Sequence, residues 1–331
     1  MQTRQITFAA RDQVVCETVA RELHAPATGA LVELRYPCIS AGPELAKLGG
    51  LQPVDYPLGP LGNRAVGRVL APGSNRDDLR PGDFVFCHGP HASHFAADGL
   101  VVKLPDALDR PETALLGMAL VALTGLRVAQ PELGDAAVVT GAGLVGQFAA
   151  QLLQLNGVNT ILVDPVPGRL DIARQCGVAH AIAAAGAADR VMDLTRGQGA
   201  DHILECTGIP TVVEGATRYA GRAAQLILIG SPRGEHPADL TAFLNSFHLW
   251  RPQGDLTLKG AHEWKIPLYP EHTARHSMAR NALILADLIV TDTLRMTPLL
   301  TAVFDPDDAQ QAYDQLRDEK DRHLGTVFAW T

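Results

Sequence analysis

The sequence of 331 residues has little of several features that define whole classes of protein. Aromatic residues make up only 5% of it, and its formal net charge is −8. This balance offers no basic patch for nucleic acid or for an anionic membrane surface. No run approaches the 18 or more apolar residues of a membrane span, and residues 1–8 lack the apolar stretch of a signal peptide. We therefore expect neither nucleic-acid nor membrane partners.

Cysteines are also few and unpaired in sequence. The chain has five, and no two of them form a Cys-x-x-Cys pair: Cys16, Cys38, Cys87, Cys176 and Cys206. An odd and scattered set does not fit a disulfide framework and indicates reduced thiols. This pattern predicts a cytoplasmic protein.

The most informative motif is a glycine triplet that follows an apolar run. The run 136–140 leads into Gly141, Gly143 and Gly146 at G-x-G-x-x-G spacing, and a helical stretch follows at once. Gly141 permits the tight turn, Gly143 lets the backbone approach a pyrophosphate, and Gly146 allows close packing of helix on strand. Leu144 and Val145 open the helix, whose free N–H groups favour phosphate. A tight strand–helix turn without a ligand is the alternative reading.

An acidic residue lies at the distance that the motif requires. A second apolar run ends on Asp164, 18 residues after Gly146. Its carboxylate would accept hydrogen bonds from the adenosine ribose and would repel a 2′-phosphate. The sequence therefore predicts a nicotinamide dinucleotide, with NAD(H) favoured over NADP(H).

The chain changes character near Arg110. The preceding residues are rich in proline and glycine and hold short alternating runs, which predict a small, mostly β domain. The following residues alternate strands with helices, as in a doubly wound parallel sheet, and 183–188 reads as a surface loop. We expect an α/β protein in which residues 119–265 form the parallel-sheet domain, and residues 1–118 and 266–331 the β-rich domain. The predicted parallel strands are 138–140, 161–164, 179–183, 201–205, 226–230 and 256–260, and a last strand, 325–330, returns to the β-rich domain.

The order of these parts resembles the medium-chain dehydrogenase/reductase family over nearly the whole chain. The landmarks are Arg80-Pro-Gly-Asp-Phe-Val85, Val102-Lys-Leu-Pro105, Leu133-Gly-Asp135, the glycine triplet, Ile203-Leu-Glu-Cys-Thr-Gly208, Ile229-Gly230 and the ending Val303-Phe-Asp-Pro-Asp-Asp-Ala-Gln-Gln-Ala-Tyr313. The resemblance implies a GroES-like catalytic domain, an inserted Rossmann domain and a nicotinamide-dependent oxidoreductase.

The zinc ligands of that family are missing. Zinc-dependent relatives carry Cys-Gly-Ser/Thr-Asp and later Gly-His-Glu. Here Ala41 stands in place of the ligand cysteine, Pro43 in place of the hydroxyl residue, and Gly62-Asn63-Arg64 in place of the second segment. The four-cysteine lobe of the structural zinc is absent from 85–95 as well. We therefore predict neither a catalytic nor a structural zinc.

Three histidines offer an alternative metal site. His88, His91 and His94 recur every third residue, but Gly89-Pro90 breaks any helix that would put them on one face. The segment also resembles a Pro-His-x-x-x-Phe stretch of zinc-lacking relatives, some of them similar to bacteriochlorophyllide hydroxyethyl dehydrogenases. His91 is therefore a candidate for catalysis or substrate orientation, with structural hydrogen bonding as the alternative.

Without a metal, the site needs polar side chains that exchange protons or stabilise an oxyanion. Positions matching the family's cleft give six candidates: Ser40, Glu44, Tyr56, Asn63, Arg64 and His91. Three carry alternative roles. Glu44 could pair with an arginine, Tyr56 could pack on the surface, and Arg64 could bind a substrate anion or pair with Glu44.

The resemblance also implies cofactor contacts beyond the glycine loop. Arg169 follows Asp164 by five residues and flanks the adenosine position, which tempers the preference for NAD(H). Thr124 corresponds to a threonine near the nicotinamide, and Thr207 and Gly230 to loops after later strands. All three could instead be ordinary strand-end residues.

The resemblance also sets the functional hypotheses. The edge strand 256–260 implies a homodimer through the Rossmann sheet. The favoured function is zinc-independent interconversion of a secondary alcohol and a ketone on a small metabolite. Reduction of a conjugated C=C or C=N bond is the alternative, and a non-catalytic cofactor-binding protein is the third reading.

Overall fold

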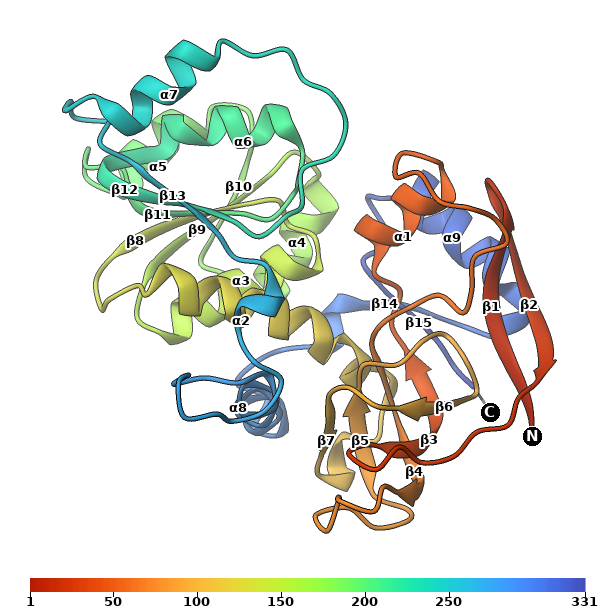
Figure 1. Cartoon of the computed structure of the whole chain (residues 1–331). Coiled ribbons are helices and arrows are strands. Elements are labelled where there is room, and N and C mark those ends of the chain that lie inside the picture. The colour runs from red at the N-terminus through yellow and green to blue at the C-terminus, as the bar shows by residue number, and fades with distance from the viewer. Residues whose placement is uncertain (331) are drawn as a thin grey trace. The chain divides into compact units, whose positions relative to one another are not determined.

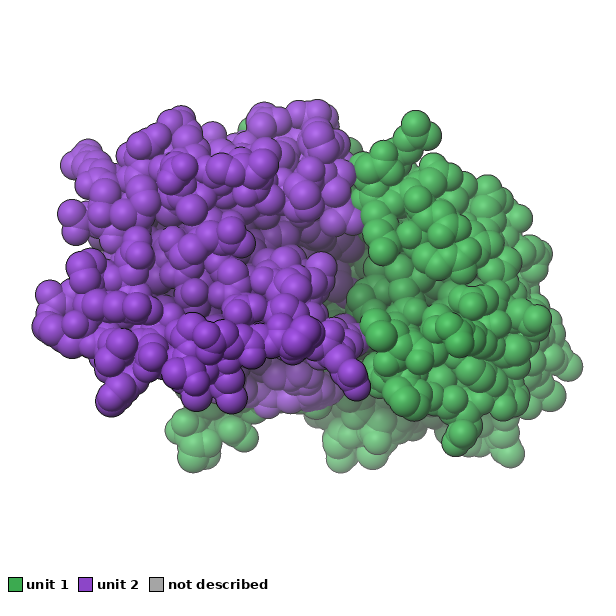
Figure 2. All heavy atoms as spheres, turned by 90° about the horizontal axis from the view of Figure 1, so that it is seen from above, with its two compact units in different colours: residues 1–117, 266–331 green, residues 118–265 purple. Residues whose placement is uncertain are grey.

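The computed structural model describes residues 1–330, which divide into two compact units. Unit 1 comprises Met1–Gly117 and Ile266–Thr331, and unit 2 comprises Met118–Lys265 (Figure 2). These limits lie one residue from the predicted division at 118/119. Each unit has its own sheet and core, so each is described by itself.

Unit 2 is built on one parallel sheet of six strands in the order β10-β9-β8-β11-β12-β13. The strands are β8 (Ala136–Thr140), β9 (Asn159–Asp164), β10 (His180–Ala183), β11 (Ala200–Glu205), β12 (Ala220–Leu228) and β13 (Thr257–Gly260). Every neighbouring pair is parallel. The order reverses between β8 and β11, and such a switch point is where doubly wound sheets bind ligands. The predicted doubly wound sheet is confirmed.

Helices cover both faces of this sheet. The unit contains α3 (Leu144–Leu155), α4 (Pro167–Gln175), α5 (Ala187–Leu194), α6 (Pro210–Ala216), η3 (Thr217–Tyr219), α7 (Leu240–His248), η4 (Glu263–Lys265) and most of α2 (Leu116–Ala129). Helices α5 and α6 lie on one face and α3 on the other (Figure 1). The central strands β8 and β9 are buried along almost their whole length, as expected for a sheet covered on both faces, whereas the edge strand β13 is mostly exposed.

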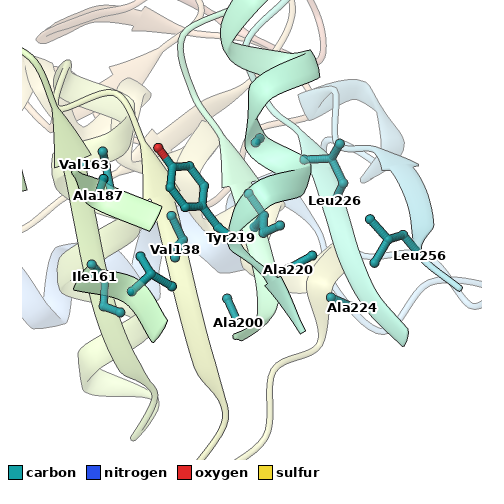
Figure 3. Close-up of a cluster of buried hydrophobic side chains, with 13 residues drawn as sticks. Val138, Ile161, Val163, Ala187, Ala200, Tyr219, Ala220, Ala224, Leu226 and Leu256 are labelled. Carbon is teal, nitrogen blue, oxygen red and sulfur yellow. The ribbon is translucent and has the colours of Figure 1, made fainter. Parts of the chain in front are cut away.

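The core under α5 and α6 is made of small and branched side chains. Val138, Ile161, Ile203 and Leu226 are fully buried. Figure 3 shows side chains from the strands meeting those of α5 and η3 in one layer. Ala187, expected in a surface loop, is instead a buried residue of α5. The alanine-rich composition of 183–188 suggested a loop, but alanine is also the side chain that lets a helix pack closely on a sheet.

Unit 1 is mostly β, as predicted. Its antiparallel sheet has the order β6-β3-β4-β5-β7, from β3 (Ala30–Pro37), β4 (Ala65–Pro72), β5 (Phe84–Cys87), β6 (His94–Ala97) and β7 (Val101–Lys103). A hairpin of β1 (Gln2–Ala10) and β2 (Gln13–Ala20) and a parallel pair of β14 (Leu300–Phe304) and β15 (Gly325–Phe328) complete the strands. Its helices are α1 (Ala41–Leu48), α8 (Met278–Val290), α9 (Ala309–Asp318) and the short turns η1 (Asp106–Leu108), η2 (Pro111–Leu115), η5 (Thr297–Leu299) and η6 (Pro306–Asp308).

The last strand returns to the N-terminal part of unit 1, as expected. The Ile39 N–H donates to the Thr326 carbonyl at 3.0 Å, and Cys38 bridges Val327. The core of this region joins α1, β1 and α9 around Phe8, Tyr313 and Phe328. Residues near both ends of the chain therefore share one hydrophobic core.

The sequence predicted no run of 18 or more apolar residues, but one helical stretch reaches that length. Residues Pro111–Ala129 are long and apolar enough to cross a membrane, although 78% of the most apolar window is buried. Burial of this kind is typical of the core helix of a globular protein, so the stretch is weak evidence for a membrane span.

Candidate active site

The glycine loop of unit 2 has the geometry of a phosphate cradle. Gly141 follows β8 with φ +92°, which only glycine adopts readily, and Gly143 is the N-cap of α3. A Cβ on Gly146 would lie 1.8 Å from the Gly141 carbonyl oxygen, whereas a Cβ on Gly143 would meet nothing within 4 Å. Gly146 is therefore required by packing, and Gly143 leaves open space before the first turn of α3. Leu144 and Val145 form that turn, and no side chain caps it.

Asp164 ends β9 and is hydrogen-bonded to this loop. Its carboxylate accepts from the Ala142 N–H at 2.7 Å and from the Val166 N–H at 2.8 Å, and the residue is 3% exposed. The Arg169 guanidinium lies 3.9 Å from the same carboxylate. The Gln147 side chain of α3 donates to the Arg169 carbonyl at 2.8 Å. The carboxylate, the guanidinium and the glycine loop are thus brought together.

Two further predicted cofactor residues lie at the carboxyl end of the sheet. The Thr207 N–H donates to the Glu205 carboxylate at 2.7 Å, and the Gly230 N–H donates to the Glu205 carbonyl at 2.9 Å. A Cβ on Gly230 would lie 2.3 Å from the Gly208 nitrogen, so the two loops touch closely. Thr124 is different, because it is buried within α2 and its hydroxyl donates to the Leu120 carbonyl at 3.0 Å.

Glu205 was not singled out from the sequence, although it organises these loops. It is fully buried at the end of β11, and burial raises the pKa of its carboxyl against the opposing hydrogen bonds from Thr207 and Gly208. Its position at a strand end beside two glycine loops was the only available signal.

In unit 1, the buried carboxylate of Glu44 accepts hydrogen bonds from three segments of the chain. Glu44 in α1 accepts from the Ser40 N–H at 2.7 Å, from His91 Nε2 at 2.9 Å and from the Tyr313 hydroxyl of α9. Glu44 is 5% exposed, and His91 and Tyr313 are fully buried. Three donors therefore converge on one carboxylate that is almost entirely buried.

The protonation of this cluster follows from its partners. Burial opposes ionisation of Glu44, but the charge and hydrogen bond of His91, with the bonds from Tyr313 and Ser40, lower its pKa below the ordinary value. Burial, reinforced by the Glu44 charge, raises the pKa of Tyr313 well above its usual range. Glu44 is thus an anion, and Tyr313 is a neutral hydrogen-bond donor.

The His91 ring is contacted by Phe328, Gly62 and Glu44. Its ring packs edge-on against Phe328 with centroids 5.3 Å apart, and a Cβ on Gly62 would lie 2.7 Å from its Nδ1. The Nδ1 atom is buried without a hydrogen-bond partner. The ring is therefore held between Glu44 and Gly62. Among residues 1–330, no group of three or more His, Cys, Asp or Glu is arranged so that it could hold a metal.

Asn63 and Arg64 form a second, adjacent arrangement. The Arg64 guanidinium donates from Nη1 to Asn63 Oδ1 at 2.7 Å and from Nε to the Gly117 carbonyl at 3.1 Å. Arg64 is 3% exposed, whereas Asn63 is exposed. The Cys38 thiol lies within electrostatic reach of both Glu44 and Arg64, which ties the two arrangements together.

Tyr56 lies apart from this cluster. Its hydroxyl donates to the Lys47 and Leu48 carbonyls at 2.6 and 3.3 Å, at the C-terminal end of α1. The alternative reading of Tyr56 as a packing residue accounts for these contacts. Tyr313 was missed instead, because nothing in the local sequence of α9 links it to Glu44.

A separate cavity of about 440 Å³ lies beside α9. It is lined by acidic and amide side chains from 307 to 319 and by none of the predicted site residues. The chemistry of the site therefore does not depend on it.

Comparisons with known proteins agree with this architecture. Residues 145–273 match the family model described as zinc-binding dehydrogenase. The chain is 32% identical over 180 residues to a D-guloside 3-dehydrogenase of Escherichia coli strain K12, covering 50% of this chain and 51% of that protein. The aligned part thus spans about half the length of that relative.

Two further similarities cover more of the chain. A protein of Haemophilus influenzae described as an uncharacterized zinc-type alcohol dehydrogenase-like protein is 28% identical over 257 residues, covering 67% of this chain and 74% of that protein. The crystal structure of galactitol-1-phosphate dehydrogenase from Escherichia coli has a TM-score of 0.84 at 19% identity, covering 99% of this chain and 100% of that one. The structural likeness shows the shared fold. The chain is therefore similar in sequence to zinc-type alcohol dehydrogenase-like proteins and has the fold of the medium-chain dehydrogenase/reductase proteins.

Proposed function

We propose that this protein is a nicotinamide-dependent dehydrogenase that interconverts a secondary alcohol and a ketone on a sugar or polyol. The glycine loop with its hydrogen-bonded Asp164 carries the proposal, since this combination is built for a dinucleotide. The sugar-derivative substrates in the names of relatives suggest the substrate class. In the oxidation, the carbinol carbon loses a hydride, the hydroxyl loses a proton and the alcohol becomes a ketone. NAD⁺, when bound, supplies the hydride acceptor.

NAD(H) is the proposed cofactor in preference to NADP(H). Asp164 Oδ2 is held at the glycine loop by the Ala142 N–H, so negative charge stands where a ribose 2′-substituent would approach. Arg169 at 3.9 Å partly offsets that charge. A carboxylate that accepts hydroxyl bonds favours the unphosphorylated ribose.

The proposed chemistry is independent of zinc. The residues present do not fit a catalytic zinc, since Ala41 has no donor atom and the Asn63 side-chain oxygen accepts from Arg64. Cys38, the nearest thiol in sequence, is fully buried, and burial together with the Glu44 charge raises its pKa to about 12. The Cys38 thiol donates to the Ile39 carbonyl at 3.5 Å within this buried position, so we do not assign it as a zinc ligand.

Purified protein, assayed first for bound metal, would be titrated with NADH and NADPH and followed by nicotinamide fluorescence. We expect saturable binding, tighter for NADH, and NAD⁺ reduction with at least one member of a panel of sugar alcohols and glycosides. Turnover of enones or imines alone would assign the protein to the reductase alternative. Binding without turnover of any class would favour a non-catalytic cofactor-binding protein.

We also propose a homodimer through the edge strand β13. This strand ends the sheet, and Leu258 on it is 46% exposed, with Trp250 and Trp264 near it in sequence 74% and 59% exposed. An unpaired edge with apolar side chains is suited to pairing with a second copy. Light scattering coupled to size exclusion would test this, and a monomeric mass would reject it.

A further inference from the structure

Glu205 accepts hydrogen bonds through both its side chain and its backbone at the carboxyl end of β11. Its Oε1 atom accepts from the Thr207 N–H at 2.7 Å and from the Thr207 hydroxyl, and Oε2 accepts from the Gly208 N–H at 3.1 Å. Its backbone carbonyl accepts from the Ile229 and Gly230 N–H groups, each at 2.9 Å. One residue therefore holds both the loop after β11 and the loop after β12.

The loops at this end of the sheet also pack on one another. A Cβ on Gly208 would lie 2.4 Å from the Ser231 carbonyl oxygen, so the loops after β11 and β12 touch. A Cβ on Gly141 would lie 2.5 Å from Thr207 Cγ2, so the loop after β11 also touches the glycine loop after β8. Glu205 is thus bonded to the middle loop of three that follow neighbouring strands.

The direction of a bound dinucleotide follows from the strand order. Strand β9, which ends on Asp164, lies on one side of β8, and β11 and β12 lie on the other side. Asp164 is placed for the adenosine ribose, and the glycine loop for the pyrophosphate. A dinucleotide that crosses the switch point between β8 and β11 therefore brings its nicotinamide half to the loops that Glu205 holds.

We propose that Glu205 is a positioning residue for the nicotinamide half of the cofactor, which it serves by holding the loop at Thr207 and Gly208 in place. The proposal rests on the proposed dinucleotide-dependent function. Because Glu205 is fully buried, it acts through this loop rather than by touching the cofactor. A loop that is ordered before the ligand arrives costs less to order on binding, which raises affinity. Loss of the Glu205 bonds therefore weakens binding of the nicotinamide half and spares the adenosine half.

The first test measures the affinities of Glu205→Gln for NADH and for ADP-ribose by calorimetry. ADP-ribose keeps the adenosine and the pyrophosphate but lacks the nicotinamide ring. In the variant, an amide that donates replaces one of the two accepting oxygens and faces a backbone N–H. The affinity for NADH should fall at least about tenfold, whereas the affinity for ADP-ribose should stay within about threefold of the wild type.

Two further variants frame this result. Gly143→Ala, at the glycine loop, should lower both affinities, because both ligands carry the pyrophosphate. Asp201→Asn is the matched control, since its carboxylate accepts the Ala136 N–H at 2.8 Å at the opposite end of the same strand. It should change neither affinity more than about twofold.

A second test uses Thr207, whose side chain is half-buried and easier to replace. Thr207→Val keeps the shape but removes the hydroxyl that donates to Glu205, and it should lower the affinity for NADH at least about fivefold. Thr207→Ser keeps the hydroxyl and should stay within about twofold. In the Glu205→Gln background, Thr207→Val should have little further effect, because the hydroxyl acts through the carboxylate. Thermal midpoints would be recorded for every variant.

Three results would overturn the proposal. They are a Glu205→Gln affinity for NADH within about threefold of the wild type, an equal loss of affinity for NADH and ADP-ribose, and full additivity of the Glu205 and Thr207 changes. The second would make Glu205 a purely structural residue. If Glu205→Gln does not fold, Thr207→Val decides, and an affinity for NADH within about twofold of the wild type rejects the proposal. Failure of the proposed function is distinguishable, because the wild type would then bind neither NADH nor NADPH.

Discussion

The buried Glu44 cluster allows a stability prediction with a definite sign and size. In Glu44→Gln the side chain keeps its shape but loses its charge and one accepting oxygen. Glu44 Oε2 accepts from both His91 and Tyr313, and Oε1 accepts from the Ser40 N–H. Hydrogen bonds to a charged group contribute about 1.5–3 kcal/mol each. With two of the three bonds lost, we expect a loss of about 3–6 kcal/mol at neutral pH.

The pH dependence of this loss follows from the lowered pKa of Glu44. A carboxyl whose pKa is lower in the folded state stabilises the fold above its unfolded pKa, close to 4.5, and loses that contribution as pH falls through the folded value. Glutamine does not titrate. The difference between wild type and Glu44→Gln should therefore be full at about pH 7 and shrink at about pH 3.

Urea denaturation followed by circular dichroism would measure both effects, with Glu33→Gln on the exposed side of β3 as the control. Tyr313→Phe removes one donor and should cost less, about 1–3 kcal/mol. A double-mutant cycle should show coupling between Glu44 and Tyr313. A Glu44→Gln difference below about 1 kcal/mol, or one independent of pH, would refute the reasoning.

Three further predictions concern the cofactor site and Tyr56. Gly146→Ala should lower both thermal stability and NADH affinity, because its Cβ would lie 1.8 Å from a carbonyl oxygen. Gly143→Ala should lower NADH affinity alone, since its Cβ would meet no protein atom. Melting curves and fluorescence titration separate the two effects. Asp164→Asn should raise the ratio of NADPH to NADH affinity at least about tenfold by removing a charge that repels a 2′-phosphate, and an unchanged ratio would reject Asp164 as its determinant. Tyr56→Phe should leave kcat unchanged and cost about 0.5–1.5 kcal/mol through the lost bond to the Lys47 carbonyl, so a large fall in kcat would return Tyr56 to the active site.

The cofactor half of the protein was readable from sequence because its geometry is local. Gly141, Gly143 and Gly146 lie within six residues, Gly141 has a positive φ, and Gly146 packs directly against the Gly141 carbonyl oxygen. Asp164 ends the neighbouring strand in both sequence and space. Parallel strands with covered faces leave short apolar runs between helices, which predicted the doubly wound sheet, whereas the strand order came from the structure.

The substrate half could be outlined but not assembled from the sequence. Ser40, Glu44, Asn63, Arg64 and His91 were identified as candidates, but their partners come from distant segments. Tyr313 lies 269 residues from Glu44, and no periodic pattern carries that pairing. The role of Gly117 could not be predicted either, because a glycine inside an apolar helix is usually explained by helix packing. Only the structure shows that the Arg64 side chain lies against it.

Arg64 shows how a buried charge depends on partners that the sequence does not reveal. A desolvated guanidinium is costly unless neighbouring groups compensate it. Here the Asn63 side-chain oxygen and the Gly117 carbonyl both accept from Arg64. A Cβ on Gly117 would lie 1.9 Å from Arg64 Cδ, so the absence of a side chain at Gly117 leaves room for the Arg64 stem. These contacts stabilise a buried cation, and none would be needed if the position were filled with an apolar side chain.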